Sequence, residues 1–342
     1  VSQKQSISVL VIVDGKIDSR LLKAVSRLPN LLCLVLELCQ IGDAELKRLV
    51  ENLQQPEKLD VLKLSKTTLT DAGLEPLSKL SGLSGLKIEG STITGGGLGK
   101  ITSKKLRSLQ LKDSRLDNQA LKFIAERWGN SLVTLDLTGS RITDSGLRSL
   151  AAMPSLKVLS VGGTSVTPEG IRDFLAERNR LSVSSIENLG LGGFRWGKKE
   201  LIVLNNLSEV SELDLSGWNL DDSDLEYLPF TKELITLNLS GTSITDEGMN
   251  LIGRIDTLQR LHLRGTQVTD AGLDVALEMP QTKFLEVGES EITFEGLMSE
   301  KFPSGKMQLD VSGMDLTVEQ LRSLAQRRPG TEVFYHGRLF IE

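Results

Sequence analysis

The sequence has little of the side chains that build catalytic and metal sites. Among 342 residues there are two histidines, two cysteines and only 4% aromatic residues. Zinc sites need clustered Cys and His ligands, and nucleophilic Ser-His or Cys-His mechanisms need a histidine beside the nucleophile. We therefore expect no enzymatic activity, no cofactor and no metal site.

Strong charge and long apolar runs are also missing. The 40 Lys and Arg against 45 Asp and Glu leave a net charge of −5. This acidic balance argues against a nucleic-acid partner, because phosphate neutralisation needs clustered basic side chains. No apolar run approaches the roughly 20 residues that a membrane span needs, and the start does not resemble a signal peptide. The chain opens abruptly at Val1, so a removed upstream segment is one interpretation.

What the sequence does contain is one repeat. The phrase LITLNLSGTSITD at 234–246 returns 24 residues later as LQRLHLRGTQVTD at 258–270. Copies begin about every 24 residues from Ile7 onward, with three longer repeats of 28, 26 and 30 residues. Thirteen copies and a degenerate fourteenth account for the chain, so the repeat decides the fold.

Each copy has two halves with different physical requirements. The Leu-x-x-Leu-x-Leu half alternates as a strand with one buried face. The Thr-Asp-x-Gly-Leu half predicts a helix start, with N-caps at Thr70, Thr143, Thr245 and Thr269 and the following aspartates beside the positive helix end. One copy cannot bury its apolar side alone, so stacked copies share a continuous core. We expect parallel strands on the inner face and short helices on the outer face.

These phrases resemble the leucine-rich repeat family. The similarity is greatest to a 24-residue bacterial subtype with Thr or Ser where other subtypes have Asn or Cys, and it extends to ribonuclease-inhibitor-like horseshoes and the repeat domains of F-box adaptors. The resemblance implies an α/β right-handed solenoid of about 13–14 repeats. It also implies protein or ligand binding on the concave strand face, with no inherent catalysis.

Length alone favours two domains, but a solenoid grows without a new core, so we predict a single domain over 1–342. A degenerate cap is expected at 330–342, and the stretch 156–218 is irregular. There Phe194 and Trp218 interrupt an inward Thr/Ser ladder, with Trp196 nearby. Either these aromatics plug a widened core or they mark a seam where a partner docks. The 28- and 26-residue repeats predict longer helices at 43–53 and 118–128.

Toward the C-terminal end the inner face becomes charged. One strand projects Arg260, His262 and Arg264, and the next projects Phe284 and Glu286. We expect Arg260 and Glu286 to pair across the ladder, because neighbouring strands lie about 4.8 Å apart. In one interpretation, this ion pair only keeps the surface solvated and contributes little to stability. Docking of an acidic or carboxylate-bearing partner is the other, since Arg and aromatic side chains are enriched at binding hot spots.

At the N-terminal end the inner face is apolar. The first predicted strand is apolar on both faces, and Val9 and Val11 are expected beside further apolar residues that include Val35. An unprotected apolar edge strand invites pairing with another chain. A missing upstream segment or a second copy in a homodimer would cover it, or the patch is an apolar partner site.

Two motifs are set aside. The glycine-rich stretch 94–101 looks like a phosphate loop, but it lacks the required first Gly and has Ile101 where Ser or Thr would bind magnesium. Cys33 and Cys39 lie too far apart along an extended strand for a disulfide. Free thiols fit a cytoplasmic, reducing compartment. A removed signal peptide and an extracytoplasmic location remain the alternative.

We therefore predict a non-catalytic protein-protein interaction module that binds a partner on its concave face. The predicted contacts are Arg260, His262, Arg264, Phe284, Glu286, Val9, Val11 and Val35. A substrate-selecting adaptor fragment of a longer protein is the alternative, and a hydrolytic enzyme is the least favoured reading. The sequence does not identify the partner.

Overall fold

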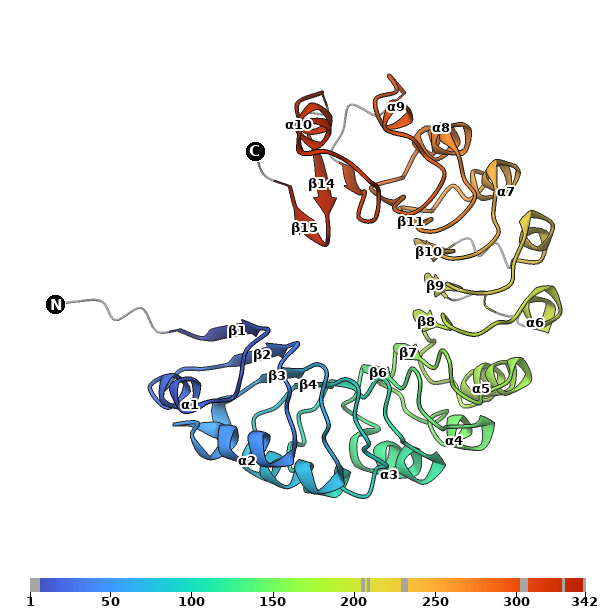
Figure 1. Cartoon of the computed structure of the whole chain (residues 1–342). Helices are drawn as coiled ribbons and strands as arrows, with labels where there is room; N and C mark the ends of the chain where they lie inside the picture. The colour runs from blue at the N-terminus through green and yellow to red at the C-terminus, as the bar shows by residue number, and fades with distance from the viewer. Residues whose placement is uncertain are drawn as a thin grey trace. The chain divides into compact units, whose positions relative to one another are not determined.

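A computed structural model of the chain describes residues 7–203, 207, 210–228, 233–301, 307–327 and 330–340. Contacts between its residues divide the chain into two compact units, Val1–Ile186 and Glu187–Glu342 (Figure 1). The boundary falls inside the irregular stretch 156–218. Each unit is built from the same strand-and-helix repeat.

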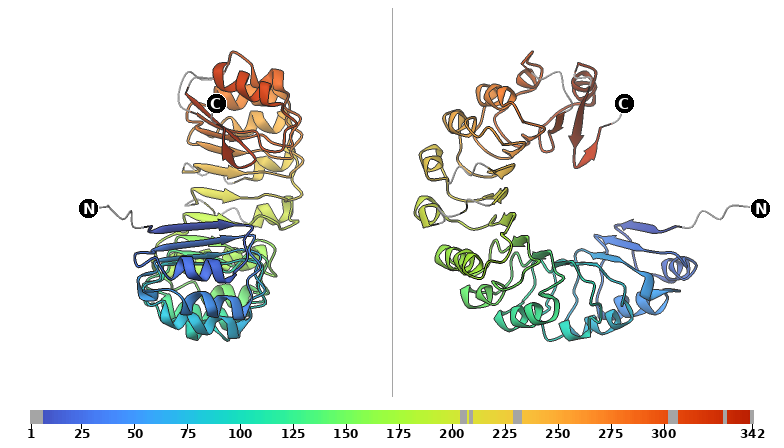
Figure 2. Two further views of the ribbon diagram at one scale, coloured as in Figure 1. Left: turned by 60° about the vertical axis from the view of Figure 1, so that its left-hand side comes forward. Right: turned by 180° about the vertical axis from the view of Figure 1, so that it is seen from behind.

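In the first unit, parallel strands form one layer and helices form the other, as both views of Figure 2 show. The strands are β1 (Val9–Val13), β2 (Cys33–Glu37), β3 (Val61–Leu64), β4 (Gly85–Ile88), β5 (Ser108–Gln110), β6 (Thr134–Asp136) and β7 (Val158–Ser160). The helices, with 3-10 turns labelled η, are α1 (Ser19–Val25), α2 (Asp43–Glu51), η1 (Pro56–Lys58), η2 (Asp71–Lys79), η3 (Leu98–Lys100), α3 (Asn118–Trp128), α4 (Asp144–Arg148) and α5 (Pro168–Arg180).

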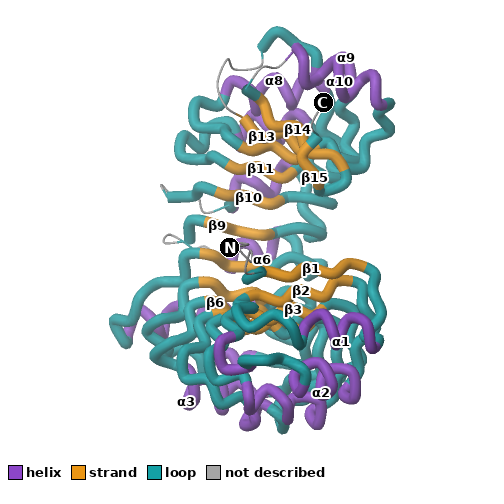
Figure 3. The backbone as a smooth tube through the Cα atoms, turned by 90° about the vertical axis from the view of Figure 1, so that its left-hand side faces the viewer, coloured by secondary structure: helices purple, strands orange, loops and turns teal. Residues whose placement is uncertain are grey.

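The second unit repeats this arrangement, with strands in orange and helices in purple in Figure 3. Its strands are β8 (Asn188–Gly190), β9 (Glu212–Asp214), β10 (Thr236–Asn238), β11 (Arg260–His262), β12 (Phe284–Glu286), β13 (Met307–Asp310), β14 (Thr331–Tyr335) and β15 (Arg338–Leu339). Its helices are α6 (Lys198–Val203), η4 (Asp222–Tyr227), α7 (Asp246–Ile252), α8 (Asp270–Glu278), α9 (Phe294–Leu297) and α10 (Val318–Arg327). The neighbours from β8 to β14 pair in parallel, and β15 turns back antiparallel to β14.

Alternation along each strand separates the core from an open surface. The middle leucines of three neighbouring strands, Leu237, Leu261 and Leu285, pair in register and are each 0% exposed. The residues on either side of them project away from the helices, on what we call the strand face. The repeat therefore confirms the predicted α/β solenoid architecture within each unit.

A tight turn follows each strand and explains many of the glycines. Gly241 and Gly265 occupy the same turn position with φ of 70° and 66°, a left-handed conformation that glycine adopts at little cost. Glu289 takes that position one repeat later with φ of 57°. This exception places a carboxylate beside the strand face.

In six of the described helices and 3-10 turns, the first residue is an aspartate that clamps the next repeat. Asp246 accepts hydrogen bonds from the backbone N–H of Thr269 at 2.9 Å and from its Oγ1 at 2.7 Å. The same bonds join Asp43 to Thr70, Asp71 to Thr94, Asp144 to Thr167, Asp222 to Thr245, and Asp270 to Thr293. The helix-start motif predicted only a helix-dipole contact for Asp71, Asp144, Asp246 and Asp270, so the contact between repeats was missed.

The clamp also explains the glycine of the Thr-Asp-x-Gly phrase. A Cβ added at Gly296 would lie 2.0 Å from Oδ1 of Asp270, and one added at Gly170 would lie 2.0 Å from Oδ1 of Asp144. Real Cβ atoms do not approach so closely. The glycine is therefore needed because the preceding repeat's carboxylate occupies the space of its side chain.

The predicted caps are confirmed with one difference. The side chains of Thr70, Thr245 and Thr269 each accept a backbone N–H in the first helical turn. Thr143 stands at the N-cap position without such a bond. Its Oγ1 instead accepts a hydrogen bond from Nδ2 of Asn118 at 2.8 Å, because asparagine replaces aspartate in that clamp.

The irregular aromatics are packed as core residues. Phe194 is 5% exposed and Trp218 is 1% exposed. Trp196 stacks on Phe194 with ring centroids 3.9 Å apart, and Trp218 Nε1 donates to the carbonyl of Leu191 at 2.9 Å. Burial and a satisfied indole N–H favour the interpretation that these rings plug a widened core.

The helix of the longest repeat, α5, carries a buried arginine near its C-terminal end. Arg178 is 1% exposed and donates to the carbonyl oxygens of Met153 at 3.1 Å and Leu156 at 3.0 Å, and also to that of Ser184. Desolvation by burial lowers the pKa of Arg178. Its side chain thus joins the loop before β7 to the irregular loop after α5.

Two further predictions are confirmed. The 26-residue repeat carries α3 over the predicted 118–128, and α2 ends at Glu51, two residues before the predicted end. Cys33 and Cys39 are free thiols, and Cys39 is fully buried.

Candidate interaction surface

Neighbouring strands of the second unit bring four of the predicted contact residues together. Register places Arg260 beside Phe284 and His262 beside Glu286. The leucines between them point into the core, so these four side chains project from the strand face. Their alignment follows from the exact 24-residue spacing of the two repeats.

An aromatic group lies at the centre of this cluster. The guanidinium carbon of Arg260 lies 4.6 Å from the ring centroid of Phe284, and the His262 ring centroid lies 4.9 Å from it. Arg260 is exposed and Phe284 is half-buried. A cation over an aromatic face is attracted by the ring quadrupole, so the three side chains support one another.

The predicted ion pair between Arg260 and Glu286 is wrong. Nδ1 of His262 lies 2.6 Å from Oε2 of Glu286, and both side chains are about one-fifth exposed. The prediction paired diagonal neighbours, whereas the register sets Glu286 directly opposite His262. We name Arg260, His262, Phe284 and Glu286 the β11–β12 cluster.

Arg264 is held apart from this cluster by a carboxylate that the sequence reading did not consider. Its Nη2 lies 2.5 Å from Oε1 of Glu289, and both side chains are about half exposed. The hydrogen bond from Arg264 lowers the pKa of Glu289, and the same bond raises the pKa of Arg264. The 24-residue spacing puts Glu289 in the turn after Arg264's neighbouring strand, and this signal was available in the sequence.

Polar side chains surround the β11–β12 cluster along the same rows. Thr236 and Asn238 flank it on β10, and Gln308 and Asp310 flank it on β13. Gln308 Nε2 donates to Glu332 at 2.9 Å. Within the described parts of the chain, no carboxylate forms an ion pair with Arg260, in contrast to His262 and Arg264. Arg260 thus keeps a charge available to an external group.

The remaining predicted contacts, Val9, Val11 and Val35, lie in the first unit. Val9 is 56% exposed and Val11 is 55% exposed, and they pair in register with Cys33 and Val35. Val35 itself is only 8% exposed. The prediction of an apolar strand face at this end is therefore met by β1, while Val35 lies largely beneath its neighbours.

The glycine-rich stretch 94–101 does not present free amides. The backbone N–H groups of Gly95 and Gly97 both donate to Oδ1 of Asp71 at 3.1 Å, and Thr94 Oγ1 donates to Oδ2. Burial alone would raise the pKa of Asp71, but these hydrogen bonds outweigh it and lower the pKa below its ordinary value. A carboxylate of the protein thus occupies the place that a phosphate would need.

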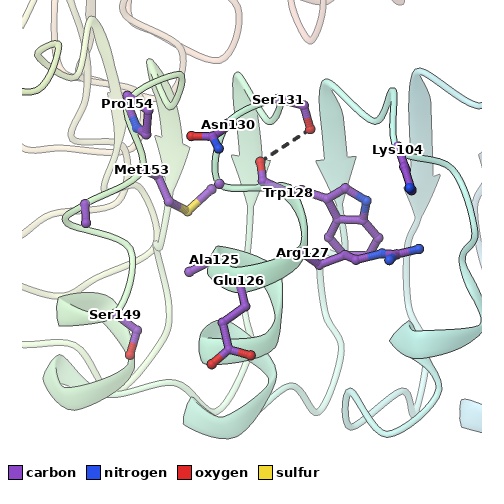
Figure 4. Close-up of a pocket in the computed structure, with 12 residues that line it drawn as sticks. Lys104, Ala125, Glu126, Arg127, Trp128, Asn130, Ser131, Ser149, Met153 and Pro154 are labelled. Carbon is purple, nitrogen blue, oxygen red and sulfur yellow. Dashed lines mark hydrogen bonds between the residues drawn. The ribbon is translucent and has the colours of Figure 1, made fainter.

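A depression of about 280 Å³ lies at the end of α3 in the first unit (Figure 4). Its wall includes Trp128, Met153, Lys104 and Glu126. Ser131 Oγ donates to the Trp128 carbonyl at 3.4 Å, as the dashed line shows. One acid and scattered basic groups do not converge on a point, so the depression is explained by the longer helix of this repeat.

Within the described segments, no group of three or more His, Cys, Asp or Glu side chains is arranged to hold a metal ion. No helix in those segments has the length and apolar character to cross a membrane.

A comparison with protein families agrees with the repeat. The profile of the family described as Leucine Rich repeat matches residues 130–151, 234–253 and 256–275. No curated protein matches. Among solved structures, the chain is similar to an internalin from Listeria monocytogenes, at 22% identity over 87% of this chain and 86% of that chain, with a TM-score of 0.45.

The matched segments contain β6 with α4, β10 with α7, and β11 with the start of α8. The same strand-and-helix unit recurs through both halves of the structure. The chain therefore has the leucine-rich-repeat fold. Proteins of this fold generally mediate protein-protein interactions.

Proposed function

We propose that the chain is a non-catalytic protein-binding module whose partner docks on the strand face of the second unit, over the β11–β12 cluster. The half-buried Phe284 ring beneath Arg260 is the observation that carries this proposal. Aromatic and arginine side chains supply much of the energy at protein interfaces. Repeat solenoids use their extended strand faces for such contacts.

The cluster is already organised for binding. The contact of Glu286 with His262 orients the imidazole, and His262 and Arg260 both lie against Phe284. The strands beneath are fixed by buried leucines. A preformed surface loses less conformational entropy on association, so more of the contact energy remains as affinity.

The charges refine the chemistry of the partner. The Arg-His-Arg column suggested an acidic or carboxylate-bearing partner, but His262 and Arg264 already contact Glu286 and Glu289. Of these three basic side chains, only Arg260 has no carboxylate partner among the described residues. We therefore expect a partner that places a flat apolar group on Phe284 and one carboxylate near Arg260. The exposed Val9 and Val11 form a second contact region in the first unit, to which the buried Val35 adds little surface.

Affinity capture with the full chain tests the proposal. Wild-type protein is compared with Phe284→Ala and Arg260→Glu, and Arg254→Glu serves as a control with the same charge change at an exposed position after α7. We expect the two cluster variants to lose one specific partner at least roughly tenfold, since hot-spot truncations cost about 2 kcal/mol or more. The control should keep it. A partner retained by all three variants would contradict the proposed surface.

A further inference from the structure

A groove of about 490 Å³ lies in the second unit, beside the N-terminal ends of β9, β10 and β11. Two rows of side chains from neighbouring repeats line it. Residues of the first row immediately precede the strands, and residues of the second row lie in the loops that lead into them. The lining residues are Ser211, Ile235 and Gln259 in the first row, and Glu233, Asp256, Thr257 and Gln281 in the second.

The apolar part of this groove is the side chain of Ile235, which is 38% exposed. The sheet fixes its place, because its backbone N–H donates to the carbonyl of Ser211 at 2.7 Å and its carbonyl accepts from Gln259 at 2.8 Å. The neighbouring repeats have Ser, Gln and Lys at this position, so the repeat itself does not require an isoleucine here. A concave site with an open apolar side chain on a rigid frame suits an aliphatic group.

Two carboxylates of the groove have no partner. Glu233 and Asp256 are exposed, and among the described residues neither side chain forms an ion pair or a hydrogen bond. The hydroxyls of Ser211 and Thr257, in contrast, already donate to backbone carbonyls at 3.1 and 2.8 Å. The groups of the groove that are available to an occupant are therefore negatively charged.

One basic side chain stands at the end of the first row. Nζ of Lys283 donates to Oε1 of Gln259 at 2.9 Å, so the ammonium lies along the row. A single ammonium does not neutralise two carboxylates. An anionic occupant would therefore meet net repulsion, whereas a cationic occupant is attracted by Glu233 and Asp256 and competes with Lys283.

We infer that this groove binds an arginine side chain of a protein partner, with its aliphatic stem on Ile235 and its guanidinium facing Glu233 and Asp256. A long basic side chain packs its stem against apolar surface while its head stays charged. The planar guanidinium carries five N–H donors, which suits contact with two carboxylates. The groove lies outside the β11–β12 cluster, so the inference goes beyond the function proposed above and does not depend on it.

A capped arginine tests the site in the full chain. The probe is Nα-acetyl-arginine methylamide at constant ionic strength, and the δ1-methyl NMR signal of Ile235, assigned with Ile235→Val, reports its binding. Nα-acetyl-citrulline methylamide is the matched probe, because it has nearly the same shape without the charge. We expect a dissociation constant of about 1–10 mM for the arginine probe, since one side chain makes few contacts, and about threefold or weaker binding of the citrulline probe. An unchanged Ile235 signal, or equal affinity for both probes, would overturn the inference.

Charge variants test the residues that face the guanidinium. Glu233→Gln with Asp256→Asn keeps the shape of the groove and should weaken the arginine probe about fourfold or more, since each exposed ion pair contributes about two- to fivefold. Glu247→Gln, at an exposed position of α7 outside the groove, is the matched control and should leave the affinity unchanged. Lys283→Gln removes the competing ammonium and should tighten binding about two- to fivefold. Unchanged affinity of the double variant, or weaker binding to Lys283→Gln, would contradict the assigned contacts.

Free arginine tests the protein source of the side chain. Its α-carboxylate adds a negative charge near Glu233 and Asp256, so it should bind no more tightly than the capped probe. Tighter binding of free arginine would contradict a side chain of a protein partner as the ligand. None of these titrations involves the β11–β12 cluster. Loss of a captured partner by Phe284→Ala and loss of arginine binding are therefore separate outcomes.

Discussion

Replacing Asp270 by alanine tests the clamp that joins successive repeats. Asp270, the first residue of α8, accepts the backbone N–H of Thr293 at 2.8 Å and its Oγ1 at 2.7 Å. A hydrogen bond to a charged group contributes about 1.5–3 kcal/mol, with the lower end appropriate for a half-exposed carboxylate. Losing both bonds should lower the free energy of unfolding by about 2–3 kcal/mol. Urea denaturation followed by circular dichroism measures this loss.

The glycine that faces the carboxylate makes the test specific. Gly296→Ala would place a Cβ 2.0 Å from Oδ1 and 2.3 Å from Cγ of Asp270. We expect it to destabilise the chain by about 2–3 kcal/mol, in the range of other overpacked sites. In an Asp270→Ala background that clash disappears, so the same change should cost less than about 0.5 kcal/mol, because alanine is the better helix former.

Asp270→Asn is the matched control. At the equivalent position Asn118 accepts the N–H of Thr143 at 2.9 Å and donates to its Oγ1 at 2.8 Å. Asparagine at 270 should therefore retain most of the stability and lose only about 1 kcal/mol. If the costs of Asp270→Ala and Gly296→Ala simply add in the double variant, the glycine is not there to admit the carboxylate, and the reasoning is refuted.

Three further predictions concern stability. Folding lowers the pKa of Asp71, so its contribution is present above its unfolded pKa and is lost as pH falls through the lower folded value. Asp71→Asn should therefore flatten the dependence of the urea midpoint on pH below about 4, and unchanged slopes would argue against it. Glu289→Gly removes the strain of a left-handed backbone but also loses one exposed ion pair with Arg264. Thermal unfolding should therefore show a stability that is equal to that of wild type or up to about 1 kcal/mol higher. Glu289→Ala keeps the strain and loses the ion pair, so it should be less stable than wild type. Trp218→Phe removes the donor to the Leu191 carbonyl and leaves a void in the core. Chemical denaturation should show that the free energy of unfolding falls by about 2–3 kcal/mol. A fall below about 0.5 kcal/mol would contradict the role of the indole N–H.

Periodicity predicted the architecture well because a solenoid is decided by local pattern and nearest-neighbour stacking. The 24-residue spacing correctly placed Val9 beside Cys33 and the longer helix at 118–128. The clamp between Asp270 and Thr293 escaped prediction although threonine and aspartate recur at these positions in several repeats. A helix-start motif already accounts for each threonine and aspartate within its own repeat. Nothing in the sequence of one repeat reveals that the carboxylate also accepts hydrogen bonds from the threonine of the next repeat.

The charged cluster was located correctly but its contacts were not. Arg260 was paired with Glu286, although strict counting of 24 residues aligns it with Phe284. Side-chain length then decides the remaining contacts, since Arg264 reaches Glu289 in the turn beyond the strand. The burial of Arg178 could not be foreseen, because its acceptors are backbone carbonyls of two separate loops, one before β7 and one after α5.

Hydrogen-deuterium exchange of the chain, alone and with its captured partner, tests the central claim most directly. Peptides that contain β11 and β12, with residues 260–264 and 284–289, should exchange more slowly in the complex. This protection should vanish when Phe284→Ala is mixed with the partner at the same concentration. Protection confined to the helices, or to β1 alone, would contradict binding at the β11–β12 cluster.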